Sequence, residues 1–132
     1  MKKLLLISIA ATIAAYTACQ KKDSTPVQPD KIAIDIKSPT TGSTFKKGDT
    51  LYINADISYP SQLHAYEVSI KNNNTNDVVF DEYQHVYTDK FSINTSWVDS
   101  LQEETDLTMQ VIVQIDHDGH QSIKELSLHS KP

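Results

Sequence analysis

The sequence predicts an all-β domain, a seven-stranded antiparallel sandwich, and three observations lead to this prediction. From residue 31 onward apolar side chains recur at every second position, which is the period of a strand with one buried face. Turn-forming residues interrupt the pattern at short intervals. No segment after residue 30 shows the 3.6-residue period of a long amphipathic helix. Many short alternating segments in one small domain are typical of two packed antiparallel sheets.

The alternating segments are separated by turn signals. The first contains Ile32, Ile34 and Ile36 and ends at the Ser-Pro pair 38–39, because proline cannot donate a ladder hydrogen bond. The strongest alternation is in residues 107–115, and Trp97 falls at an inward-facing position of the segment before it. The expected strands are residues 32–37, 51–58, 66–70, 78–86, 91–97, 107–115 and 123–128.

The remaining stretches are expected to be turns. They are residues 41–43, 46–49, the asparagine-rich 72–77 and the acidic 99–104, the last with room for a single helical turn. Lys124 and Glu125 interrupt the final alternation. A bulge at this point would return Leu126 and Leu128 to the inner face.

Length and charge limit the functions that this chain can have. Its 132 residues allow one domain, and its charged fraction of 22% and apolar fraction of 39% are those of an ordinary globular protein. The formal net charge is -5, and all 12 basic residues are lysine, so the forked arginine contacts to phosphate and guanine are missing. Nucleic acid is therefore not expected as a partner.

The N-terminus predicts export and a lipid anchor. Lys2 and Lys3 precede an uncharged run that is too short to span a bilayer, which is typical of a secretory signal peptide at residues 1–18. Residues 16–19, Tyr-Thr-Ala-Cys, resemble a bacterial lipobox, although Tyr16 stands where leucine is usual. That resemblance implies that Cys19, the one cysteine, is lipidated and acylated. The alternative is a soluble secreted protein with a free thiol.

Residues 19–30 are then the lipidated cysteine and a flexible tether, and residues 31–132 the folded domain. No acidic residue follows Cys19 directly, so resemblance to lipoprotein sorting in enterobacteria implies the outer membrane. Periplasmic and surface orientations both remain open.

Two turn motifs resemble those of bacterial immunoglobulin-like (Ig-like) domains, especially in small Bacteroidota lipoproteins. Residues 34–55 contain a P-x-x-G-x-x-F-x-x-G-D run between the first two strands, and residues 115–122, Ile-Asp-His-Asp-Gly-His-Gln-Ser, are similar to the final hairpin, with His120 in place of asparagine. The resemblance implies an Ig-like sandwich. Its strand order would place the tether and the final hairpin at the same end of the domain.

The stretch around Gly119 is most simply a hairpin turn, because Asp-Gly suits a backbone with positive φ. An EF-hand calcium loop is a poor match, because Glu125 stands at position ten counted from Asp116. Ig-like topology, however, would bring His64, His85, His117 and His120 to this end, with Asp118 or Asp116 as an oxygen donor. Such a set suits zinc or copper, so a metal site is a second hypothesis.

No enzyme is expected, because the chain contains no G-x-S-x-G, glycine-rich phosphate loop or H-E-x-x-H motif. Five tyrosines could include outward-facing rings for a sugar or protein partner: Tyr52, Tyr59, Tyr66, Tyr83 and Tyr87. The sequence thus favours a membrane-anchored, non-enzymatic binding or accessory protein of the cell envelope, with an envelope protein or a polysaccharide as partner. Metal binding is the alternative.

Overall fold

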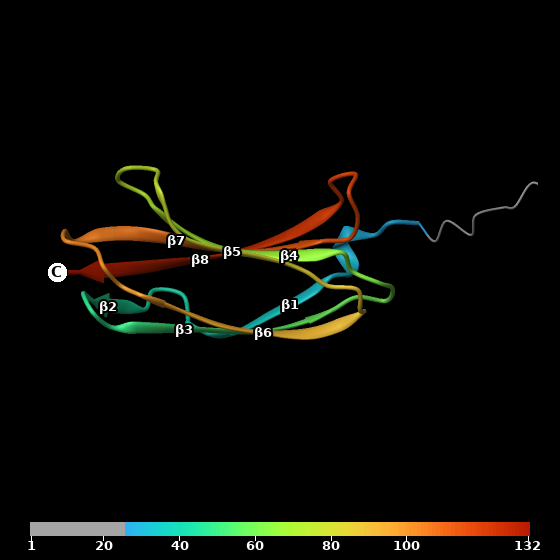
Figure 1. Ribbon diagram of the computed structural model, residues 1–132, viewed down its shortest axis with the longest axis horizontal. Helices are drawn as coiled ribbons and strands as arrows, with labels where there is room; N and C mark the ends of the chain where they lie inside the picture. Colours follow the sequence, from blue (N-terminus) through green and yellow to red (C-terminus); the bar gives the residue numbers. More distant parts are fainter. Residues whose placement is uncertain (1–25) are drawn as a thin grey trace, which may run out of the picture.

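The computed structural model describes residues 26–132, which form two antiparallel-based sheets packed face to face (Figure 1). A 3₁₀ turn, η1 (Pro29–Lys31), precedes the strands. The strands are β1 (Ala33–Ser38), β2 (Thr44–Lys46), β3 (Thr50–Ser58), β4 (Ala65–Asn72), β5 (Val78–His85), β6 (Lys90–Val98), β7 (Thr105–Gln114) and β8 (Gln121–Lys131). Within the described residues, no helix is long and apolar enough to cross a bilayer.

The strand order confirms the predicted sandwich. One sheet has the order β1-β3-β6, and the other has the order β2-β8-β7-β4-β5. The chain therefore crosses between the layers five times, whereas β4–β5 and β7–β8 are hairpins within the larger sheet, a connectivity found in Ig-like domains.

The prediction of seven strands is wrong by one, because residues 26–132 contain eight. The extra strand, β2, lies where the sequence predicted turns on both sides, and it pairs in parallel with β8, Thr44 opposite His129 and Lys46 opposite Lys131. Three residues are too few to show an alternating pattern. Their partner strand lies more than eighty positions away in the chain, so no local signal marks the pairing.

The inner faces of the two sheets form one apolar core. On β7 the side chains of Leu107, Met109, Val111 and Val113 are fully buried, so the strongest alternation in the sequence is the centre of the larger sheet. On β6 Trp97 is 8% exposed and lies opposite Leu51 of β3, which confirms it as a core residue. The next residue, Val98, faces outward and is 54% exposed.

The bulge predicted in the last strand is absent, because β8 pairs with β7 in one unbroken register from Gln121 to Ser130. Lys124 lies opposite the buried Val111, on the inward-facing side of the sheet. Its ammonium group donates a hydrogen bond of 2.8 Å to the backbone oxygen of Ile34 on β1. The lysine thus reaches across the open flank between the two sheets, and its long side chain keeps its charge near solvent.

Glu82 bridges the opposite flank. It lies on the edge strand β5, opposite the buried Val68 of β4. Its carboxylate accepts hydrogen bonds from the hydroxyls of Tyr66 (3.0 Å) and Thr95 of β6 (2.5 Å). Burial, together with this bond and the negative charge of Glu82, raises the pKa of Tyr66 to about 12, so its hydroxyl remains a donor.

The N-terminal segment lies at the end of the sandwich that carries the β7–β8 hairpin, as the Ig-like topology implied (Figure 1, right). The backbone N–H of Gln28 donates to the hydroxyl of Tyr59, and η1 is in contact with β8. The last residues of the predicted tether, 28–30, thus contact the domain, while Gln28 and Asp30 remain exposed. Cys19 and the predicted signal peptide lie outside the described residues.

Candidate functional site

Three histidines meet at the end of the sandwich where the N-terminal segment lies, and backbone hydrogen bonds hold the central one in place. His64 directly precedes β4. Its N–H donates to the oxygen of Gln114 at the end of β7, and its own oxygen accepts from the N–H of Val86, just after β5. His85 ends β5, and His117 lies in the β7–β8 hairpin. Three connections that are far apart in sequence therefore converge at His64.

The rings at this end are in contact with one another. The ring centre of His64 lies 3.8 Å from that of His117 and 4.9 Å from that of His85. Tyr87 lies 5.9 Å from His64 and stacks parallel to His85 at 6.3 Å, and Tyr83 meets His85 edge-on at 5.2 Å. We call these five residues, His64, His85, His117, Tyr83 and Tyr87, the histidine–tyrosine pole.

His64 is the buried member of this pole. It keeps 9% of its surface exposed, and its Nε2 atom is buried without a hydrogen-bond partner among residues 26–132. Burial lowers the pKa of His64, and positive charge on His117 or His85 would lower it further, whereas the carboxylate of Asp116 acts in the opposite direction. Burial and the neighbouring imidazoles therefore both disfavour the charged form of this ring.

The hairpin after β7 forms the predicted Asp-Gly turn. Gly119 has a φ of 89°, a conformation that glycine adopts at little cost. Asp116 closes the turn, because its carboxylate accepts hydrogen bonds from the N–H groups of Asp118 (2.9 Å) and His120 (3.3 Å) and from Nδ1 of His120 (2.7 Å). Burial alone would raise the pKa of Asp116, but these bonds outweigh it and hold that pKa below its usual value.

The structure divides the histidines of the metal hypothesis into two groups. His64, His85 and His117 come together, whereas His120 is bonded to Asp116, which makes both of them less available as ligands. Asp118 is exposed on the same hairpin. Within the described residues, no three His, Cys, Asp or Glu side chains have donor atoms already gathered around one point.

The tyrosines of the pole could not be selected from the sequence. Tyr59 and Tyr66 are buried, while Tyr52, Tyr83 and Tyr87 are 65%, 44% and 68% exposed. Tyr52 lies on β3, in the other sheet, and forms no part of the pole. The signal for Tyr83 was its place two residues before His85 on one strand, which puts both side chains on the same face.

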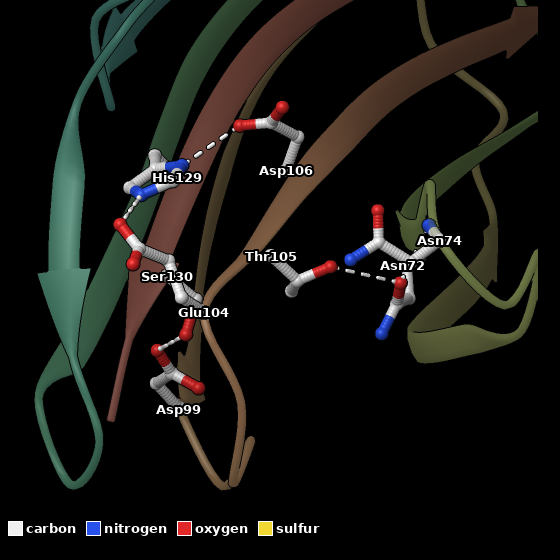
Figure 2. A network of polar contacts seen from close by, with 8 residues as sticks. All are labelled: Asn72, Asn74, Asp99, Glu104, Thr105, Asp106, His129 and Ser130. Atoms are coloured by element: carbon white, nitrogen blue, oxygen red, sulfur yellow. Dashed lines mark hydrogen bonds and ion pairs between the residues drawn. The ribbon is translucent and has the colours of Figure 1, made fainter.

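The opposite end of the sandwich carries a separate polar network (Figure 2). The fifth histidine, His129 on β8, bonds Asp106 through Nδ1 (2.7 Å) and Glu104 through Nε2 (2.8 Å). Asn72, at the end of β4, accepts a hydrogen bond from the hydroxyl of Thr105 and fixes the asparagine-rich turn through the N–H groups of Asn74 and Thr75. These contacts link β8 to the start of β7 and link the asparagine-rich turn to Thr105.

The histidine of this network predicts a specific pH dependence of stability. Hydrogen bonds to Asp106 and Glu104 raise the pKa of His129 above its unfolded value of 6.5. Its stabilising effect is therefore complete below that value and is lost as the pH rises through the raised pKa. We expect His129→Gln to lower the free energy of unfolding more at about pH 5.5 than at about pH 8.5 in urea titrations. An equal loss at both pH values would contradict this assignment.

Comparison with known proteins supports the fold and goes no further. No family model and no curated protein matches the chain. Among solved structures, wild-type OgpA from Akkermansia muciniphila matches with a TM-score of 0.53 at 14% identity, over 74% of this chain and 27% of that one. The fibronectin(III)-like modules of CbhA from Clostridium thermocellum match with a TM-score of 0.45 at 14% identity, over 75% of this chain and 96% of the module.

This chain thus spans about a quarter of OgpA. At this identity the likeness shows the fold alone. Together with the strand order, it shows an Ig-like β-sandwich.

Proposed function

We propose that the protein is a lipid-anchored component of the outer membrane whose Ig-like domain is a non-enzymatic binding module. The observation that carries the proposal is the histidine–tyrosine pole, where exposed aromatic rings gather at one end of the sandwich. Aromatic rings with polar tips are enriched at recognition surfaces because they bury much area at low entropic cost. Another envelope protein or a polysaccharide is the partner that this surface suits.

The position of the pole supports the anchoring part of the proposal. The N-terminal segment packs at the same end, through Gln28 and Tyr59, and continues toward the lipobox-like residues 16–19. Eight residues, 20–27, separate Cys19 from Gln28 and span at most about 29 Å when fully extended. An anchor at Cys19 would keep the pole within that reach of the membrane, while the His129 network would face away from it.

Membrane fractionation tests the anchor. The full chain expressed in a Gram-negative host should sediment with the outer membrane and incorporate labelled palmitate, and Cys19→Ser should abolish the label and release the protein. Unchanged membrane association of Cys19→Ser would exclude lipidation at this cysteine.

The same strains test the binding surface. A photoreactive side chain at position 87 should give a discrete cross-linked product in envelopes, and the product should disappear when His85 is replaced by alanine. Position 52 is the matched control, because Tyr52 is about as exposed as Tyr87 but lies on β3 of the other sheet. Identical products from both positions would show that the pole is not the contact surface, whatever the outcome for Cys19.

A further inference from the structure

We infer that His64, His85 and His117 bind a divalent zinc or copper ion at the histidine–tyrosine pole. The inference goes beyond the proposed function, because it depends on neither the lipid anchor nor a macromolecular partner. Three steps lead to it: an unsatisfied nitrogen, the separation of the rings, and the local supply of charge.

The unsatisfied nitrogen is Nε2 of His64. A buried polar atom without a partner is unfavourable, and buried polar groups in folded proteins usually find partners. Here Gln114 and Val86 fix the backbone of His64 on both sides, so the ring is attached at a fixed point, and 9% of the residue is exposed. An imidazole nitrogen without a hydrogen-bond partner is available to a metal ion as a ligand.

As they stand, the three described histidines do not form a complete metal site, and one side chain must move before they can share an ion. Zinc binds imidazole nitrogen at about 2.0–2.1 Å, which places the centres of two ligating rings roughly 5–6 Å apart. His64 and His85 are already near this value at 4.9 Å. His64 and His117 are too close at 3.8 Å, so the ring of His117 must move outward by roughly 1–2 Å. His117 is exposed on a hairpin, so a change of side-chain rotamer would supply this movement.

The surroundings favour a cation. Asp116 and Asp118 are carboxylates on the same hairpin, on either side of His117. Three imidazoles are a familiar protein ligand set for zinc, and they leave a fourth position for water or a carboxylate. Imidazole nitrogens suit copper equally well, so the two ions are the probes of choice.

Titration calorimetry of the purified full chain in detergent, with zinc chloride and copper sulfate in separate runs, tests the inference. We expect one ion per chain, bound with a micromolar or lower Kd. Because His85 and His117 are exposed, His85→Gln and His117→Gln should fold normally, and each should weaken binding by about tenfold or more. His64→Gln should do the same, with circular dichroism to verify its fold.

His129→Gln is the matched control, since it removes a histidine from the opposite end of the domain, and it should leave the affinity unchanged. His120→Gln should have little effect, because that ring is bonded to Asp116. Asp118→Asn reports whether the fourth position is a carboxylate or water.

Failure to bind either ion overturns the inference. So does binding that survives the combined replacement of His85 and His117, or that is lost equally in His129→Gln. Cross-linking from position 87 in envelopes is measured independently, so loss of the metal site would leave the proposed binding function standing.

Discussion

Replacing Asp99 with alanine is expected to lower the free energy of unfolding by roughly 3 kcal/mol. Asp99 is 1% exposed, and its carboxylate accepts hydrogen bonds from the hydroxyl of Ser130 (2.5 Å) and the N–H of Leu101 (3.0 Å). Hydrogen bonds to a charged group each contribute roughly 1.5–3 kcal/mol, and the fully buried Ser130 would be left without this acceptor. Urea unfolding followed by far-ultraviolet circular dichroism measures the loss.

Two further substitutions make the Asp99 test specific. Asp99→Asn keeps the shape and one oxygen acceptor, so its effect should lie between those of wild type and alanine. Asp77→Ala, at an exposed position on the β4–β5 turn, is the matched surface control and should change stability by no more than about 0.5 kcal/mol. If Asp99→Ala behaves like Asp77→Ala, the bond to Ser130 does not hold β8 in place.

Trp97→Ala is expected to have the largest effect, a loss of about 3–5 kcal/mol in the free energy of unfolding. The indole is 8% exposed within the core between the two sheets, and its removal leaves a cavity that the surrounding strands can fill only in part. Trp97 is the one tryptophan of the chain, so circular dichroism rather than intrinsic fluorescence must follow unfolding.

Val98→Ala is the neighbouring control, because Val98 points to the opposite face of β6 and is 54% exposed. It should change stability by no more than about 0.5 kcal/mol. Similar losses at both positions would mean that β6 does not present one face to the core.

The strands that could be predicted are those with a strong period-two pattern. In β7 four alternate side chains are completely buried, and β3 and β6 follow the same rule against each other. The predictions of strand number and of a bulge in the last strand were wrong where the local residue pattern does not determine which strands pair. β2 is a strand because it pairs in parallel with β8. Lys124 points toward the other sheet because the pairing of β8 with β7 continues without a bulge. Both depend on distant partners rather than on local residue types.

Part of the candidate site followed from topology, and part did not. The approach of His64, His85 and His117 could be expected once the order of strands was assumed. The sequence could not show that Asp116 forms a hydrogen bond with the ring of His120, because this bond depends on the shape of one tight turn. The acidic turn at 99–104 was predicted, but the sequence could not show that Asp99 is buried, because this depends on its backbone hydrogen bonds with Gly48 and Asp49.

The charges that bridge the two flanks, Glu82 and Lys124, also affect how neighbouring copies meet. Glu82 lies on the edge strand β5. Lys124 lies on β8 outside residues 129–131, which are the part of β8 that pairs with β2. Inward-pointing charges on such strands hinder the addition of a foreign strand, since pairing would bury them. With the anchor proposed at Cys19, copies would meet at high local density on the membrane. The two residues would therefore keep crowded copies from joining edge to edge into fibrous aggregates.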